Sequence, residues 1–167
     1  METRFTIGLL VENRHGVLNK IAGLYSKRGY GIDSLAASGT ENPAYSRITI
    51  VSRGDGQMRT QVVRQLNKLC EVKKIAVLED AGSVAVEHLL IKIKTGAREG
   101  DGVAALVAQY GGRVMDRGER FLVADVAGAP ETIQEFIEKC RPIGIYELCR
   151  SGALALSGGT NHSLSLN

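Results

Sequence analysis

The loop Asn13-Arg14-His15-Gly16, between a predicted strand and a predicted helix, carries the most informative polar pattern in the sequence. A helix that begins after Gly16 presents backbone N–H groups without intrahelical partners, and glycine has no side chain to block a small carboxylate. The amide of Asn13 can accept a hydrogen bond from an ammonium group or donate one to a carboxylate, or it can simply cap the helix. A free α-amino acid carries both charges, so this loop is a candidate site for such a ligand.

A second short pattern, Arg28-Gly29-Tyr30-Gly31, matches the opening of the RNA-recognition signature. In RNA-recognition domains that signature lies on the third strand, where aromatic residues stack on bases. Here it follows a predicted helix, its later aromatic positions hold Ile32 and Leu35, and only 5% of all residues are aromatic. We therefore predict no nucleic-acid binding. Instead we expect Gly29 to end the helix and Gly31 to ease the entry into the next strand.

No catalytic signature is present in the sequence. It lacks the G-x-S-x-G, P-loop and H-E-x-x-H patterns, and its histidines, His15, His88 and His162, have no cysteine or carboxylate at metal-ligand spacing. We predict neither a catalytic site nor a metal site. Each of these histidines by itself is most simply a surface or capping residue.

The remaining composition indicates a cytoplasmic protein. Cys70, Cys140 and Cys149 lie in or beside apolar patterns, and we interpret them as small buried residues in a reducing compartment. A formal net charge of +3, spread along the chain, does not indicate a nucleic acid or a membrane as partner. No apolar run approaches the roughly 18 residues that a membrane-spanning helix needs.

The elements that must position these residues occur twice along the chain. The first run has strands at 4–12, 32–38, 47–52 and 72–78, with helices marked by Leu18, Ile21, Ala22 and Tyr25 and by Val62, Val63, Leu66 and Leu69. The second has strands at 89–94, 113–116, 120–126 and 143–149, with helices marked by Val103, Leu106, Val107 and Tyr110 and by Ile133, Phe136, Ile137 and Cys140. Each run is a split β-α-β of the ferredoxin-like kind. The sequence therefore predicts an α+β fold with two ferredoxin-like βαββαβ domains in tandem.

We expect domain boundaries at 1–79 and 84–156, with a linker at 80–83 and a disordered tail at 157–167, where the residues are small, polar and rich in glycine. Domains this small bury little surface alone, so we also expect pairing with another copy or another protein.

The segment LVENRHGVLNKIAGLYSKRGYGIDSL resembles the amino-acid-binding ACT domain of acetolactate synthase small (regulatory) subunits. The similarity continues through YSRITI, QLNKLCEVKKI and LLIKIK, and ends with YELCRSGALAL. It covers nearly the whole chain in one order. The family resemblance implies that residues 1–79 form an ACT domain and residues 84–156 a C-terminal small-subunit domain.

The resemblance implies a regulatory role in branched-chain amino acid biosynthesis. In this family two ACT domains pair side by side as a homodimer, and valine or a related branched-chain amino acid binds at the pairing interface. The implied effector residues are Asn13, His15, Gly16 and Val17, with Gly31 and Ile32 contributed by the other copy. The small subunit binds and activates the large catalytic subunit and confers feedback inhibition. Thiamine diphosphate, magnesium and FAD belong to that large subunit, and this chain has no cofactor of its own.

One position departs from the family pattern. The family usually has G-Y-N-I or G-F-N-I where this chain has Gly29-Tyr30-Gly31-Ile32, so the asparagine that reaches the effector is missing. We therefore expect a weaker or different response to valine. The effector's identity among valine, leucine and isoleucine stays open. A stand-alone ACT-domain sensor that acts on another protein remains the alternative function.

Overall fold

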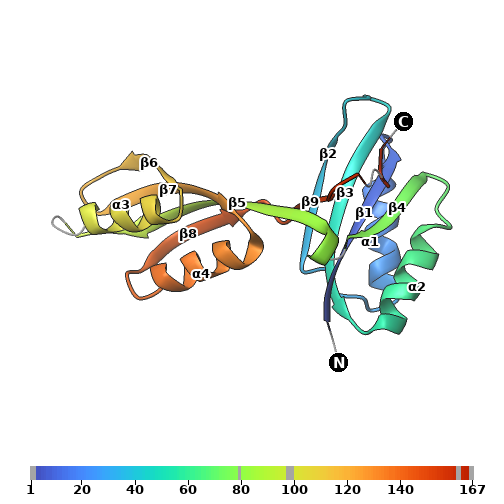
Figure 1. Ribbon diagram of the computed structural model, residues 1–167, viewed down its shortest axis with the longest axis horizontal. Coiled ribbons are helices and arrows are strands. Elements are labelled where there is room, and N and C mark those ends of the chain that lie inside the picture. The colour runs from blue at the N-terminus through green and yellow to red at the C-terminus, as the bar shows by residue number, and fades with distance from the viewer. Residues whose placement is uncertain (1–2, 79, 97–99, 161–162, 166–167) are drawn as a thin grey trace. The chain divides into compact units, whose positions relative to one another are not determined.

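The computed structural model describes residues 3–78, 80–96, 100–160 and 163–165 (Figure 1). It forms two compact units, one made of residues 1–85 together with 153–167 and the other of residues 86–152. Both units combine one antiparallel sheet with two helices, which confirms the predicted fold class. Within the described residues, no helix is both long and apolar enough to cross a membrane.

The first unit packs two helices on one face of a four-stranded sheet (Figure 1). Its elements are β1 (Thr3–Glu12), α1 (Val17–Lys27), β2 (Ser34–Gly39), β3 (Tyr45–Gly54), α2 (Gly56–Leu66) and β4 (Val72–Leu78), and the strand order is β2-β3-β1-β4. Alternate residues of β1, namely Phe5, Ile7, Leu9 and Val11, are buried as predicted. They pack against Val17, Ile21 and Tyr25 of α1 and form the core of this unit.

Gly29 ends helix α1, as predicted. Its φ of +67° lies in the left-handed region that favours glycine. The backbone N–H of Tyr30 donates to the carbonyl of Tyr25 at 3.0 Å, and that of Gly29 donates to Ser26 at 3.2 Å. Gly31, in contrast, has no positive φ and no heavy atom within 4 Å of where a Cβ would lie. The expected conformational need for glycine at position 31 is therefore not found.

The second unit repeats the same strand order. Its elements are β5 (Ser83–Lys94), α3 (Gly100–Gln109), β6 (Arg113–Arg117), β7 (Phe121–Gly128), α4 (Pro130–Cys140) and β8 (Ile145–Arg150), ordered β6-β7-β5-β8 in the sheet. The first residues of β5 belong to the first unit. Pro130 begins α4 as predicted, and the four apolar residues predicted to face inward from this helix are all buried.

The C-terminal segment differs from the sequence expectation. Residues 153–156 group with the first unit instead of the second, and a ninth strand, β9 (Leu154–Ser157), pairs with β5. The backbone N–H of Gly158 donates to the carbonyl of Gly82 at 2.7 Å. In the expected disordered tail, residues 157–160 and 163–165 are placed on the first unit, while 161, 162, 166 and 167 lie outside the described residues.

An apolar sheet face explains this placement. The side of β1 that faces away from the helices carries the buried Leu10, and Val51 and Leu78 lie on the same side in the neighbouring strands. Leu164, only 6% exposed, packs so closely on β1 that a Cβ added at Gly8 would lie 2.5 Å from its Cδ1 atom. Covering apolar surface favours this arrangement, and a glycine in β1 makes room for it.

The cysteines correct one interpretation of the sequence. Cys140 is buried, and its burial raises the pKa of the thiol to about 11. Cys70 and Cys149 are exposed, so the prediction that all three are buried is wrong for these two. Cys70 follows the end of α2, and Cys149 lies on the edge strand β8, where a local apolar pattern does not ensure that a side chain is buried.

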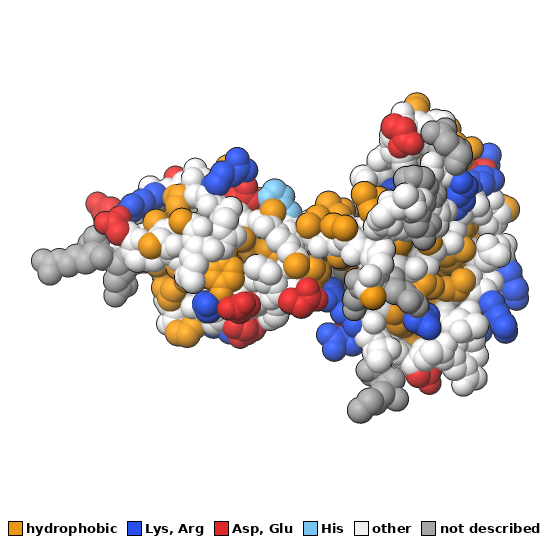
Figure 2. Space-filling view, in the orientation of Figure 1, with side chains coloured by type: hydrophobic (Ala, Val, Ile, Leu, Met, Phe, Trp, Pro, Cys, Tyr) orange, Lys and Arg blue, Asp and Glu red, His pale blue; other side chains and the backbone are white. Residues whose placement is uncertain are grey.

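Basic and acidic side chains are interspersed over the face of the molecule shown in Figure 2.

Candidate effector site

The candidate site is a surface hollow of about 350 Å³ where β1 meets α1, which we call the β1–α1 hollow. Four of the six predicted effector residues, Asn13, His15, Gly16 and Val17, line it together. The other lining residues are Val11, Glu12, Arg14, Leu18, Ala37, Ser38, Gly39, Ser46 and Ile48. The predicted loop therefore forms one side of the β1–α1 hollow, and strands β2 and β3 form the other side.

Gly16 shapes the helix end of the hollow. It precedes α1 with φ +84° and ψ −7°, and no side chain caps the helix there. A residue with a Cβ would pay about 1–2 kcal/mol for this left-handed conformation. The first turn of α1 contains no acidic side chain. Backbone N–H groups at the start of the helix therefore lie at the hollow without an intrahelical partner, and they can bind a carboxylate.

Asn13 holds the loop instead of capping the helix. Its backbone N–H donates to the carbonyl of Ala44 at 2.8 Å, and its Nδ2 donates to the carbonyl of Pro43 at 3.0 Å. These bonds tie the loop to the turn between β2 and β3 and commit the amide nitrogen. Among the described residues, no group donates to Oδ1 of Asn13. This oxygen can accept a hydrogen bond from a ligand ammonium group.

The two remaining predicted residues, Gly31 and Ile32, do not line the β1–α1 hollow of their own chain. Gly31 is exposed, and Ile32 is 37% exposed, just before β2. Their predicted contact with an effector runs across a pairing interface with another copy, and it stays a prediction.

The sequence reasoning missed the strand side of the hollow. Ala37, Ser38 and Gly39 of β2 line it together with Ser46 and Ile48 of β3. The signal was available in the sequence as a run of small residues, since small side chains on a strand leave room beside it.

Paired charges lie at one side of the hollow, where Glu12 and Arg14 line it and the backbone N–H of Glu12 donates to the carbonyl of Glu71. Glu12 contacts Arg14 Nε at 2.9 Å and Lys73 Nζ at 2.6 Å, and the hydrogen bond from Lys73 holds the pKa of Glu12 below its ordinary value. Glu71 accepts a hydrogen bond from Lys20 of α1, which is the main reason why its pKa falls to about 2. Both carboxylates have a cationic partner, so an incoming ligand carboxylate does not meet unpaired negative charge there.

The lowered pKa of Glu71 predicts how the stability of the fold depends on pH in the acid range. Because its folded-state pKa lies below the ordinary value of 4.5, ionised Glu71 stabilises the fold above about pH 4.5, and this contribution is lost as pH falls towards 2. We expect Glu71→Gln to lower the urea midpoint at pH 7 and to flatten its decline between pH 4.5 and 2. Glu41→Gln, at an exposed position, is the matched control and should behave as wild type. Parallel pH profiles for wild type and Glu71→Gln would contradict the assignment.

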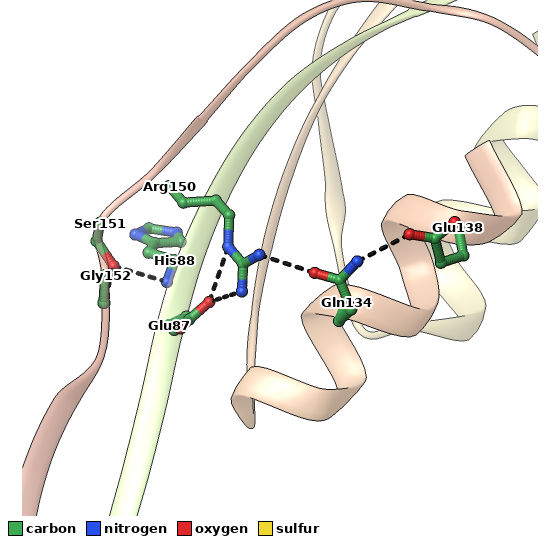
Figure 3. Close-up of polar contacts among 7 residues, drawn as sticks. All are labelled: Glu87, His88, Gln134, Glu138, Arg150, Ser151 and Gly152. Carbon is green, nitrogen blue, oxygen red and sulfur yellow. Dashed lines mark hydrogen bonds and ion pairs between the residues drawn. The ribbon is translucent and has the colours of Figure 1, made fainter. Parts of the chain in front are cut away.

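In the second unit, a polar network holds the end of strand β8 (Figure 3). The Glu87 carboxylate, on a residue only 3% exposed, accepts from Arg150 Nε at 2.9 Å and also from its Nη2. Arg150 Nη1 donates to Gln134 Oε1 at 2.9 Å, and Gln134 Nε2 donates to Glu138 Oε1 at 2.8 Å. The network therefore ties β5 and β8 to helix α4.

The residues after Arg150 are tied to β5 as well. The backbone N–H of Ser151 donates to the carbonyl of His88 at 2.9 Å, and Ser151 Oγ accepts from the backbone N–H of His88 at 3.0 Å (Figure 3). The Ser151 hydroxyl donates to the carbonyl of Gly152. These contacts give a structural role to the YELCRSG stretch on which part of the family resemblance rests.

Comparisons with known proteins agree over nearly the whole chain. Residues 7–74 match the family model described as the AHAS small subunit-like ACT domain, and residues 86–159 match the one described as the small subunit of acetolactate synthase. A probable acetolactate synthase small subunit from Methanothermobacter thermautotrophicus is 36% identical over 155 residues, 92% of each chain. The acetolactate synthase small subunit from Bacillus subtilis is 35% identical over 162 residues, 96% of this chain and 94% of that one.

A solved structure shows the same fold. The crystal structure of the acetolactate synthase small subunit from Thermotoga maritima superposes with a TM-score of 0.87 at 27% identity, covering 95% of this chain and 99% of that one. With two family models covering both halves and full-length relatives above 30% identity, the chain belongs to the family of acetolactate synthase small (regulatory) subunits.

Proposed function

We propose that this chain activates an acetolactate synthase catalytic subunit and makes it sensitive to a branched-chain amino acid bound in the β1–α1 hollow. The observation that carries the proposal is that Asn13 and the uncapped start of helix α1 lie at the same hollow, with Oδ1 of Asn13 free of any donor in the described residues. An acceptor for the ammonium group and N–H donors for the carboxylate are the two features that a free amino acid requires.

The lining of the hollow favours an aliphatic ligand side chain. Val11, Val17 and Ile48 line it and are almost fully buried, and none of them offers a polar side-chain atom. Leucine and isoleucine are isomers that each exceed valine by one methylene group, a difference that a hydrophobic pocket separates by only about 1–3 kcal/mol. We propose valine first, because the family resemblance implies it.

The effector site is proposed to be completed by a second copy. Strand β2 lies at the edge of its sheet, and an edge strand can extend the sheet of another chain. Side-by-side pairing of two first units would bring Gly31 and Ile32 of one copy near the hollow of the other. Thiamine diphosphate, magnesium and FAD are placed on the catalytic subunit in this proposal, and none on this chain.

The test is acetolactate formation from pyruvate by the cognate large subunit, titrated with this chain in the presence and absence of valine. We expect activation, followed by inhibition as valine is added. Asn13→Ala should keep the activation and lose much of the valine response, because the ammonium acceptor is removed. Asn67→Ala, an exposed asparagine of the same unit away from the hollow, is the matched control and should behave as wild type.

A stand-alone sensor gives different results in the same assay. If no ratio of this chain to the large subunit changes the rate, and the two proteins do not co-purify, the regulatory proposal fails. Activation with equal valine responses of wild type and Asn13→Ala would retain the regulatory role and remove the effector from the β1–α1 hollow.

A further inference from the structure

A second hollow, of about 850 Å³, lies in the second unit between the end of β5, the start of α3 and the turn between β6 and β7. We call it the β5–α3 hollow. Because both sheets have the same strand order, this corner corresponds to the corner that forms the β1–α1 hollow in the first unit. Its described lining residues are Lys94, Thr95, Gly96, Gly100, Arg117, Gly118, Glu119, Arg120, Ile143 and Tyr146. We propose that it binds a small molecule that carries a phosphate group.

Thr95 supplies an unused hydrogen-bonding group at this hollow. The residue is only 8% exposed, and its backbone N–H donates to the carbonyl of Arg120 at 3.0 Å. Its hydroxyl has no hydrogen-bond partner in the described part of the chain. This hydroxyl is not among the described side-chain atoms that are buried without a partner, so it reaches the solvent at the hollow and is open to hydrogen bonding. A ligand atom in the hollow would satisfy it.

The charge of the described lining is positive. It includes the basic residues Lys94, Arg117 and Arg120 and one acidic residue, Glu119. The guanidinium of Arg117 lies against the start of α3, where a Cβ added at Gly100 would be 2.6 Å from its Nη2 atom.

The position of Arg117 favours a bound anion. The start of a helix is already electropositive, so a guanidinium there is stabilised by a negative partner. Asp101 contacts Arg117 Nη2 at 2.8 Å, but the Asp101 side chain is 90% exposed and leaves the hollow open. An anion in the hollow would lie near both the helix start and the guanidinium.

The excess of cations favours phosphate over a simple carboxylate. A phosphate group carries close to two negative charges at neutral pH, and arginine binds it through two parallel hydrogen bonds. Even when Asp101, the partner of Arg117, is included, the described basic residues at the β5–α3 hollow outnumber the acidic ones, whereas the β1–α1 hollow is lined by one arginine, Arg14, which is paired with Glu12. Ile143 and the half-exposed Tyr146 add an apolar side to the β5–α3 hollow that can contact the organic part of a ligand.

The experiment titrates the full-length chain with inorganic phosphate and, separately, with acetate at constant ionic strength, following backbone amide NMR shifts. We expect saturable shifts at Thr95, Gly100 and Arg117, with phosphate binding roughly ten-fold tighter than acetate or more. Arg117→Gln combined with Arg120→Gln should weaken phosphate binding by roughly ten-fold or more. Arg141→Gln removes one exposed positive charge from the same unit outside the hollow and should leave binding unchanged.

Substitutions at Thr95 distinguish a specific phosphate site from a general attraction of anions to positive charge. Thr95→Val removes only the hydroxyl and should weaken phosphate binding roughly three- to ten-fold, while Thr95→Ser should bind as wild type. Equal loss in Arg141→Gln and the double arginine variant would overturn the proposal. So would unchanged binding in Thr95→Val, or acetate binding as tightly as phosphate.

Discussion

Replacing Gly31 with asparagine is expected to tighten the valine response of the activated enzyme by roughly ten- to hundred-fold. The family pattern that this sequence resembles has an asparagine at this position, and we propose that this asparagine contacts the effector bound by the other copy. Adding a hydrogen bond to a charged group stabilises a complex by about 1.5–3 kcal/mol, which corresponds to this change in affinity. The structure allows the substitution, because Gly31 is exposed, has no positive φ and has no heavy atom within 4 Å of the added Cβ.

The readout is the valine concentration that gives half-maximal inhibition of acetolactate formation. Gly31→Ala is the matched control, because it adds a Cβ without an amide and should leave the midpoint near that of wild type. A midpoint in Gly31→Asn equal to that of Gly31→Ala would show that the residue does not reach the effector. The variant would then also count against the side-by-side pairing on which the contact depends.

The second large effect is expected on stability, from Arg150→Met. This change removes the guanidinium from the Glu87 carboxylate, which belongs to a residue only 3% exposed. Removing one partner of a buried ion pair costs about 3–5 kcal/mol. We expect about 3 kcal/mol, the lower end, because the Arg150 side chain is itself 29% exposed. The loss should fall on the second unit, where β5, β8 and α4 meet.

Amide hydrogen exchange of β5 and β8, together with urea unfolding, measures this loss. Glu87→Gln combined with Arg150→Met should recover most of it, because no unpaired charge is then buried. Arg141→Met breaks an ion pair with Glu138 in which both side chains are more than half exposed, and it should cost about 1 kcal/mol or less. Similar losses in Arg150→Met and Arg141→Met would contradict a buried role for Glu87.

Local residue patterns determined the elements of this fold and one side of the candidate site. Alternating apolar residues predict β1, and Pro130 with four inward-facing apolar residues predicts α4, because each pattern reflects the period of its own element. Gly29 ends α1 for an equally local reason, its left-handed backbone. The loop from Asn13 to Val17 was predictable in the same way, since a strand, a glycine and a helix follow one another there.

Contacts between residues far apart in the chain were decided only by the tertiary structure. Leu164 covers the sheet face beside Gly8, and Glu87 meets Arg150 across 63 positions, so neither the ordered C-terminal segment nor the buried ion pair has a local signature. The same holds for the β2 and β3 side of the β1–α1 hollow. The physical reason is that period and turn chemistry act over a few residues, whereas burial depends on which surfaces the completed sheets leave uncovered.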